Sequence, residues 1–201
     1  MTKVLQVMAG GDIGGAEEFF MRLVPALTNA GTKQRVILRR HEQRQELLNN
    51  LAIPITTCRF GGMFDFRTRI RIRSELASFQ PDLVMAWMNR AAQFSPKGDH
   101  VLAARIGGYY NLKYYRHCDH LIGNTLAIRD YLTKHGWPEK RAWYIPNFAD
   151  NNRAKPIERD SQNTPKKVPN IPKVARLAAA PLTIDLIFVL LLLMKKRERK
   201  K

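Results

Sequence analysis

A cluster of glycines near the start of the chain is the strongest chemical signal in the sequence. The apolar run of residues 4–8 leads into Ala9-Gly10-Gly11-Asp12-Ile13-Gly14-Gly15-Ala16-Glu17. Glycines let the backbone turn tightly and approach a ligand, and a helix that follows points its free N–H groups into such a loop. Phosphates, sugar hydroxyls and carboxylates are the groups that such a loop binds. The spacing is neither G-x-G-x-x-G nor G-K-[ST], so we expect a polar ligand without a dinucleotide fingerprint or a Walker loop.

Polar side chains follow further apolar runs, where they can reach the same ligand. Asn89 and Arg90 come after residues 83–87, and their side chains can hydrogen-bond a sugar and pair with a phosphate, respectively. The segment directly after residues 101–106 is Gly107-Gly108-Tyr109-Tyr110, and the tyrosine rings can stack on a sugar. The predicted ligand-contacting residues are Asp12, Gly14, Gly15, Asn89, Arg90, Arg105, Gly108, Tyr109 and Asn124. None of them is predicted to be a catalytic residue or a metal ligand.

Local structural roles are open to several of these residues as well. A loop aspartate such as Asp12 commonly hydrogen-bonds its own backbone. Asn124 can cap the helix expected next in the chain, as can Thr125. Glu17 and Glu18 lie in a first helical turn, where carboxylates interact favourably with the helix dipole, and we expect both to have this capping role.

Apolar runs with strand character alternate along the chain with segments of helical character. We expect strands at residues 4–8, 34–40, 54–58, 83–87, 101–106, 119–123 and 143–145. Helices are expected at residues 16–30, 42–51, 66–79, 112–116 and 126–135. Strands that alternate with helices form βαβ units and a parallel sheet. The predicted fold class is therefore α/β, a Rossmann-like doubly wound parallel sheet that binds its ligand at the carboxyl ends of the strands.

One of these helices carries a run of arginines. Arg67, Arg69, Arg71 and Arg73 alternate with other residues as in a strand, but the apolar residues of the segment also fit helical spacing, and we choose a helix. The arginines then form a solvated helix face or, in a functional interpretation, contact an anionic membrane or a phosphorylated acceptor. Near an anionic membrane each arginine contributes about 1 kcal/mol of binding.

The chain is strongly basic. Its 34 Lys and Arg against 17 Asp and Glu give a formal net charge of +17 over 201 residues. Residues 151–201 hold 13 of the cationic residues and 4 of the acidic ones, so the last quarter of the chain contains over half of the excess. Such a charge indicates a phosphorylated substrate, an anionic membrane surface or nucleic acid as partner. Nucleic acid is the least favoured, because no helix-turn-helix, zinc-finger or RNA-recognition motif is present.

The two cysteines, Cys58 and Cys118, fit neither a metal site nor a disulfide framework. Met1 leads directly into the first strand rather than into a secretory signal. We therefore expect a cytoplasmic location, at the inner face of the membrane if the basic surface contacts lipid. The run of residues 117–120, His-Cys-Asp-His, is not expected to bind a metal, because successive residues entering a strand point to opposite faces.

Four segments, taken together, resemble retaining GT-B glycosyltransferases of family 4. They are residues 10–17 of the glycine loop, Gln80-Pro81-Asp82-Leu83-Val84, Asp119-His120-Leu121-Ile122-Gly123-Asn124-Thr125 and Tyr144-Ile145-Pro146-Asn147-Phe148. The resemblance covers about residues 3–150. It implies that the chain is a single GT-B half, the domain that binds the acceptor, often a lipid-linked or lipopolysaccharide sugar.

The resemblance also implies what the other half of such an enzyme does. In the family a second domain binds a nucleotide sugar and supplies a pair of glutamates, with basic residues that hold the diphosphate. Positive charge and backbone N–H groups stabilise that diphosphate as it leaves. No cofactor is implied beyond the nucleotide sugar as co-substrate. The implied partners are a glycan or lipid-linked acceptor and, through the basic surface, an anionic membrane.

The sequence departs from the family pattern in two places. Many members carry a histidine just after the fourth core strand, where this chain has Trp87-Met88-Asn89-Arg90. No second βαβ series and no glutamate pair follow Phe148. We therefore expect an acceptor-side half, residues 1–150, that is inactive alone.

Residues 151–201 have a different composition. Residues 151–172, rich in Asn, Pro, Lys and Asp, are expected to form a linker, and residues 173–201 an irregular tail that is first apolar and then basic. The tail indicates truncation or translation out of frame, or else a membrane anchor that would make the chain a tail-anchored binding protein. Its apolar run is shorter than the roughly 20 residues of a spanning helix and contains Pro181 and Asp185.

Overall fold

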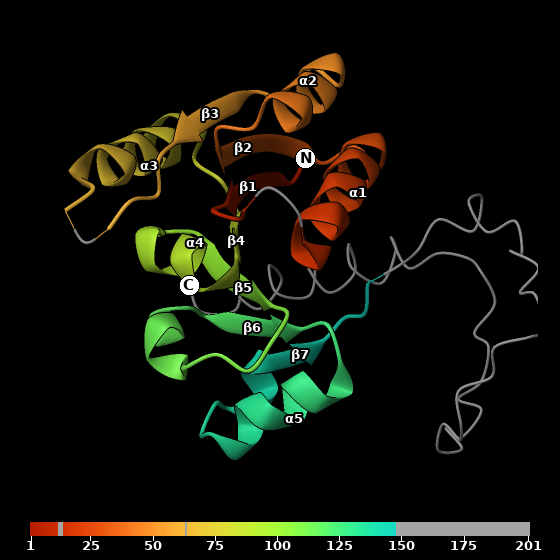
Figure 1. Cartoon of the computed structure of the whole chain (residues 1–201), viewed down its shortest axis with the longest axis vertical. Coiled ribbons are helices and arrows are strands. Elements are labelled where there is room, and N and C mark those ends of the chain that lie inside the picture. Colours follow the sequence, from red (N-terminus) through yellow and green to blue (C-terminus); the bar gives the residue numbers. More distant parts are fainter. Residues whose placement is uncertain (12–13, 63, 148–201) are drawn as a thin grey trace, which may run out of the picture.

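Seven parallel strands form the sheet around which the chain is folded. The structure, a computed structural model, describes residues 1–11, 14–62 and 64–147 (Figure 1). The strands lie in the order β3-β2-β1-β4-β5-β6-β7. They are β1 (Lys3–Met8), β2 (Lys33–Arg39), β3 (Ile55–Cys58), β4 (Leu83–Trp87), β5 (Val101–Ile106), β6 (His120–Gly123) and β7 (Ala142–Tyr144). The order reverses between β1 and β4, and doubly wound sheets bind their ligands at this switch point.

Helices cover both faces of the sheet. They are α1 (Gly15–Asn29), α2 (Glu42–Asn50), α3 (Phe66–Phe79), α4 (Met88–Phe94) and α5 (Leu126–Lys134), with the 3₁₀ turns η1 (Leu112–Tyr115) and η2 (Glu139–Arg141). One hydrophobic core joins α1 and α2 to strand side chains such as Met8 and Leu38. A second core joins α3, α4 and α5 to side chains of the opposite face, such as Val7 and Ala86. Figure 1 shows α1 and α3 on opposite sides of the sheet, which confirms the predicted doubly wound α/β fold.

Local sequence explains where these elements begin. All residues of β4 and β5 are buried, and both strands are nearly continuous apolar runs, as expected for strands covered on both faces. Asp65 caps α3 by accepting a hydrogen bond from the Thr68 N–H at 3.0 Å. Thr125 caps α5 in the same way, accepting from the Ile128 N–H at 3.1 Å. Such caps satisfy N–H groups that the first turn of a helix leaves unpaired.

A chain of buried polar side chains ties the centre of the sheet to α1. The Trp87 indole N–H donates to Gln6 Oε1 at 2.9 Å, and Gln6 Nε2 donates to Gln34 Oε1 at 2.9 Å. Gln34 Nε2 in turn donates to the Val24 carbonyl and to Thr28 Oγ1, each at 2.7 Å. These bonds connect β4, β1, β2 and α1 beneath the carboxyl edge of the sheet. Because each member is buried and partnered, the loss of one leaves others unsatisfied.

The elements agree with those expected from the sequence, with boundaries within one residue, apart from α4 and the 3₁₀ turn η2, which were not expected. Nothing in the sequence predicted α4, because it follows β4 directly, without a loop and without a side-chain cap. Met88, its first residue, has a left-handed φ of 63°, which lets the chain turn from strand to helix at one residue. The expected domain boundary at residue 150, the linker at 151–172 and the tail at 173–201 lie outside the described residues. Within those residues, no helix has the length and apolarity that a membrane span requires.

We predict that Gln6→Leu lowers the free energy of unfolding by about 2–4 kcal/mol. The substitution leaves the Trp87 indole N–H and Gln34 Oε1 buried without their partner, and each orphaned group costs about 1–3 kcal/mol. Urea denaturation followed by tryptophan fluorescence measures the change. Gln43→Leu, at an exposed position of α2, is the matched control and should stay within about 0.5 kcal/mol of the wild type. Equal stability of the two variants would contradict the prediction.

Candidate functional site

A crevice of about 270 Å³ opens at the carboxyl edge of the sheet, at the switch point between β1 and β4. The segments that follow β1, β4, β5, β6 and β7 all contribute to it. The residues that matter most for its chemistry are Gly14, Gly15, Met88, Arg105, Asn124 and Asn147. Among the residues expected to contact a ligand, Gly14, Gly15, Arg105 and Asn124 therefore lie together. Asp12 lies outside the described residues.

Arg105 is the cation of the crevice, whose lining also includes the carboxylate of Glu17, and only 5% of the Arg105 surface is exposed. Its Nη2 donates to the Ile145 carbonyl at 2.9 Å and to Asn147 Oδ1 at 2.8 Å. The guanidinium also lies over the Phe19 ring at 4.3 Å and within 5.9 Å of the Trp87 ring centroid. Burial lowers the pKa of the Arg105 guanidinium to about 10, because desolvation disfavours the charged form. The side chain therefore remains a cation at neutral pH.

One nitrogen of this cation has no partner. Arg105 Nη1 is buried and makes no hydrogen bond to any described residue. Buried polar atoms in native proteins are almost always paired, and an orphaned one calls for a ligand or another explanation. Because Arg105 lines the crevice, Nη1 is a donor available to a ligand oxygen there.

Asn124 provides the complementary group. Its Oδ1 is likewise buried and unpartnered within the described part of the chain. The sequence left open whether Asn124 or Thr125 caps α5, and the structure assigns the cap to Thr125. Asn124 is thus free of that role and lines the crevice. Within the part of the chain that the structure describes, the crevice thus holds an unsatisfied donor and an unsatisfied acceptor.

Glu17 holds the glycine loop in place, in contrast to the capping role that we expected for it. Its side chain is buried, and Oε1 accepts a hydrogen bond from the Gly11 N–H at 3.0 Å. A Cβ on Gly10 would lie 2.0 Å from Glu17 Oε1, and one on Gly14 would lie 2.4 Å from Glu17 Oε2. A side chain at either position would therefore displace the Glu17 carboxylate from its present place. Glu18, by contrast, is exposed and pairs with Arg22 at 3.6 Å.

The other predicted ligand-contacting residues lie outside the crevice. Gly108 has the Tyr110 ring 3.3 Å from the position that a Cβ would occupy. Tyr109 is 66% exposed, and its ring meets that of Tyr131 edge-on at 5.2 Å. Tyr110, which the site prediction omitted, does line the crevice, and its hydroxyl contacts Met88 Sδ at 4.0 Å. Tyr109 and Tyr110 are adjacent and both follow β5, so the sequence alone does not show which of the two lines the crevice.

Asn89 and Arg90 line a second hollow beside the crevice, between α3, α4 and η1. Its volume is about 630 Å³, and an adjoining hollow of about 170 Å³ shares four of its residues, Arg69, Gln93, Phe94 and His117. We call the two together the basic groove. Arg90 Nη1 donates to the Phe60 carbonyl at 3.3 Å.

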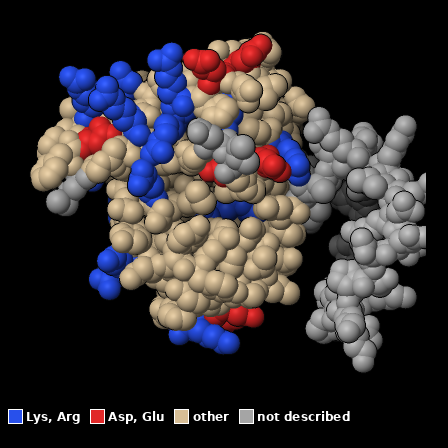
Figure 2. Space-filling model, viewed as in Figure 1, with Lys and Arg blue, Asp and Glu red and all other residues tan. Residues whose placement is uncertain are grey.

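The four arginines of α3 divide among different surroundings. Arg69 lies over the Phe94 ring at 4.9 Å and lines the basic groove, as does Arg73. Arg71 Nη1 donates to the Thr57 carbonyl at 2.5 Å, and Arg67 is exposed. Figure 2 shows Lys and Arg side chains gathered over the region of α3 and β3. The alternating pattern in the sequence thus does not produce one uniform basic face.

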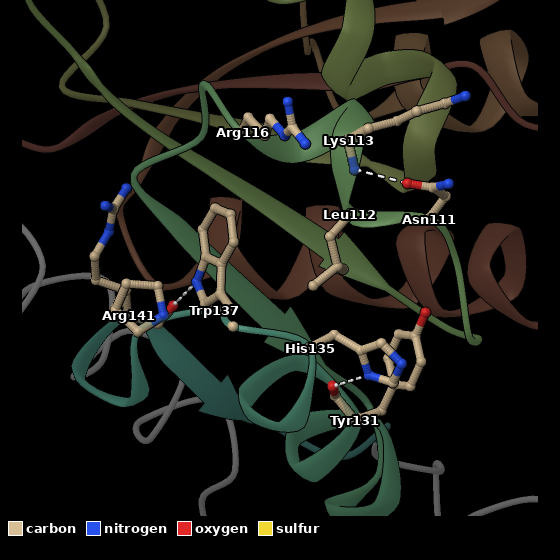
Figure 3. Close-up of a pocket in the computed structure, with 10 residues that line it drawn as sticks. Asn111, Leu112, Lys113, Arg116, Tyr131, His135, Trp137 and Arg141 are labelled. Atoms are coloured by element: carbon tan, nitrogen blue, oxygen red, sulfur yellow. Dashed lines mark hydrogen bonds between the residues drawn. The ribbon is translucent and has the colours of Figure 1, made fainter.

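A further hollow of about 630 Å³ lies on the flank of the sheet, between η1 and α5 (Figure 3). The rings of Tyr131 and His135 lie against each other at 4.1 Å on one side of it. Arg141 lies on the other side, where its Nη2 donates to the Cys118 carbonyl at 2.6 Å and its own carbonyl accepts from the Trp137 indole. These polar groups are used within the protein, so this hollow is a weaker candidate than the crevice.

The histidine and cysteine side chains near β6 have internal partners. His117 Nε2 lies 2.8 Å from the Ala92 carbonyl, and the Trp143 indole donates to His120 Nδ1 at 3.1 Å. Burial raises the pKa of the Cys118 thiol to about 12 and raises that of the Cys58 thiol as well. Both cysteines are therefore protonated at neutral pH and are not nucleophiles.

Sequence comparison connects the chain to enzymes that transfer sugars. Residues 13–153 match the model of Glycosyltransferase Family 4. The lipopolysaccharide core biosynthesis glycosyltransferase LpsD of Rhizobium meliloti (strain 1021) is 33% identical over 168 residues, which are 81% of this chain and 48% of LpsD. LpsE of the same organism, another lipopolysaccharide core biosynthesis glycosyltransferase, is 29% identical over 83% of this chain and 49% of its own length. The chain thus spans about half the length of the curated relatives that it matches.

Structural comparison gives the same fold. The crystal structure of Anabaena HepE in complex with UDP-glucose superposes with a TM-score of 0.57 at 16% identity, covering 75% of this chain and 45% of HepE. At this identity the likeness establishes the fold alone. The fold is one half of the two-domain GT-B arrangement.

We predict opposite outcomes for alanine substitutions within the glycine loop. Gly10→Ala and Gly14→Ala displace the Glu17 carboxylate and break its bond to the Gly11 N–H, so each should lower the free energy of unfolding by about 1–3 kcal/mol. Gly15→Ala meets no atom within 4 Å and lies in the first turn of α1, where alanine is favoured over glycine by up to about 1 kcal/mol. Thermal and urea denaturation test both. If all three alanine substitutions lowered the free energy of unfolding to the same extent, contact with the Glu17 carboxylate would not be the cause of the destabilisation.

Proposed function

Because the chain belongs to Glycosyltransferase Family 4, we propose that residues 1–150 are the acceptor-binding half of an enzyme that transfers a sugar from a nucleotide sugar to a glycan. We propose that the acceptor is a glycan or lipid-linked sugar of the lipopolysaccharide or capsule type, and the names of LpsD and LpsE favour lipopolysaccharide. The observation that carries this proposal is the pair of unpartnered polar atoms, Arg105 Nη1 and Asn124 Oδ1, in the crevice.

This pair suits the hydroxyl groups of a sugar. A hydroxyl both donates and accepts hydrogen bonds, so neighbouring hydroxyls of one ring can accept from Arg105 Nη1 and donate to Asn124 Oδ1. A site built to hydrogen-bond hydroxyls discriminates strongly against ligands that lack them, because its own buried groups are then left unpaired. The glycine loop lets the backbone approach a ligand in the crevice closely, and the first residues of α1 line the same crevice.

Transfer itself requires groups that we place on a donor half. The described residues form one Rossmann-like unit, and the crevice opens outward from its carboxyl edge. A nucleotide sugar bound there would have its diphosphate stabilised by a second, facing set of donors. We therefore propose that this chain binds acceptor but needs a separate donor-binding domain to catalyse transfer.

A second proposal concerns the outer face of α3 and the loop before it. Phe64, Phe66 and Ile70 are large apolar side chains that are 77%, 61% and 64% exposed. Arg67 and Arg73 are exposed on the same helix. Exposed aromatic and aliphatic side chains among arginines fit the interface of an anionic membrane, which would bring the acceptor half to a lipid-linked substrate.

We predict that the chain alone binds a lipopolysaccharide core oligosaccharide and transfers no sugar to it. Nucleotide release from UDP-, GDP- and ADP-linked sugars measures transfer, and saturation-transfer NMR measures oligosaccharide binding. Asn124→Ala should weaken binding about 10-fold by removing the orphaned acceptor, while circular dichroism confirms the fold. Steady turnover by the chain alone would overturn the need for a donor half. Absence of any glycan binding would overturn the acceptor-half proposal.

We predict that the chain sediments with phosphatidylglycerol vesicles and not with phosphatidylcholine vesicles. The double substitution Phe66→Ser and Ile70→Ser should reduce sedimentation at least several-fold, because it removes the apolar contact area of α3. The control is Leu47→Ser with Leu126→Ser, which removes two exposed apolar side chains from other helices. If the control pair reduces sedimentation as much as the α3 pair does, the α3 face is not the membrane contact.

A further inference from the structure

The basic groove carries an excess of positive charge that nothing in the fold explains. Its lining contains Arg69, Arg73, Arg90 and Lys113, contributed by α3, α4 and η1. Among the residues that the structure describes, no Asp or Glu lines either of its two parts. Among the described residues, none of the four cations forms an ion pair, whereas Arg35 pairs with Glu75 at 2.9 Å and Arg129 with Glu139 at 2.8 Å.

The cations are held close to one another despite their mutual repulsion. Arg69 and Arg73 are four residues apart on α3, where like charges destabilise a helix. The single carboxylate of α3, that of Glu75, is engaged by Arg35 from β2 and by Thr56 Oγ1. Among the described residues, no carboxylate of α3 is therefore left to pair with the cations of the groove, so a ligand anion is a suitable counter-charge.

Three of the four cations of the groove have a contact that positions them, and the fourth, Arg73, is exposed. Arg69 lies on the Phe94 ring, and Phe94 in turn packs edge-on against Phe60 at 5.7 Å. Arg90 is held by the Phe60 carbonyl, and Lys113 lies 5.0 Å from the Tyr114 ring centroid. Guanidinium groups fixed in this way lose little conformational freedom when they bind an oxyanion.

The groove also lies where an extended ligand would reach from the crevice. Met88 lines the crevice, and the next two residues of α4, Asn89 and Arg90, line the groove. On the other side Tyr110 lines the crevice, and η1, which carries Lys113, follows it directly in the chain. A ligand with one sugar in the crevice therefore presents its neighbouring units to these cations.

We propose that the basic groove binds a negatively charged group of the acceptor, a sugar carboxylate or a phosphate, next to the sugar held in the crevice. This inference rests on the proposed acceptor-half function and adds to it the class of acceptor: an acidic glycan. Arginine and lysine bind carboxylates and phosphates through charge-assisted hydrogen bonds, roughly twice as strong as those between neutral groups. The described lining holds neutral amides, Asn89 and Gln93, beside its cations and no carboxylate, so its net charge favours an anionic ligand over a neutral one.

The test compares acidic and neutral probes on the full-length chain. Trigalacturonate is set against galactotriose, from which it differs by carboxylates, and glucose 6-phosphate against glucose, with dissociation constants from NMR titration at fixed salt. We expect each acidic probe to bind about 10-fold or more tightly than its neutral counterpart, which corresponds to about 1.4 kcal/mol. A preference in the first pair alone indicates a carboxylate site, and one in the second pair alone indicates a phosphate site.

Two double variants place the preference on the groove. Arg69→Gln with Lys113→Gln should abolish the preference for acidic probes, whereas Lys134→Gln with Lys140→Gln, which removes the same charge from exposed positions around the end of α5 and η2, should retain it. Equal binding of acidic and neutral probes, no binding of either acidic probe, or equal effects of the two double variants would each overturn the inference. If neutral oligosaccharide still binds and Asn124→Ala weakens that binding, the acceptor-half proposal stands while this inference falls.

Discussion

The burial of one cation, Arg105, is the constraint on which the arrangement of the site depends. Removing a guanidinium from water costs several kcal/mol unless other groups replace its hydration. The Ile145 carbonyl and the Asn147 amide replace part of that hydration, and the faces of Phe19 and Trp87 replace another part. These partners come from the segment after β7, from α1 and from β4, so the cation joins parts of the fold that are distant in sequence. Arg105 Nη1 has no hydrogen-bond partner among the described residues, and this lowers the stability of the free protein. A ligand that accepts a hydrogen bond from Nη1 would therefore stabilise the fold.

Trp87 connects this site to the stability of the sheet. Its ring lies beside the Arg105 guanidinium, while its indole N–H donates to Gln6 in the buried polar chain that reaches α1. The same side chain packs edge-on against Phe20 at 5.2 Å. The floor of the crevice is thus part of the hydrophobic core rather than a separate layer, and core packing determines the geometry of the cation above it.

The fold was predictable because parallel strands covered on both faces leave a clear apolar pattern, and the ends of such strands gather at one edge. The same reasoning identified Gly14, Gly15, Arg105 and Asn124, which the structure places in one crevice. The sequence did not predict α4, because this helix starts without a loop and without a side-chain cap, which are the usual signs of a helix start. A single left-handed residue, Met88, makes the turn from β4 instead. It also assigned Glu17 to the helix dipole, because the contact of its carboxylate with the Gly11 N–H depends on how the loop folds back. The sequence predicted phosphate contact for Arg69, Arg73 and Arg90, but it did not predict that they share a groove with Lys113, since these cations come from three segments that only the fold brings together.

The bonding of Arg105 has a mechanical consequence. A guanidinium is planar and rigid, so when Nη2 is held by the Ile145 carbonyl and by Asn147 Oδ1, the direction of Nη1 is fixed with it. Ile145 and Asn147 lie on the backbone that leaves the last strand of the sheet. A displacement of that backbone would therefore change the direction of the Arg105 Nη1 donor in the crevice. A ligand bound to Nη1 would in turn restrain the position of that backbone. The path of the polypeptide after the last strand and the orientation of any ligand bound to Nη1 are therefore coupled through a single side chain.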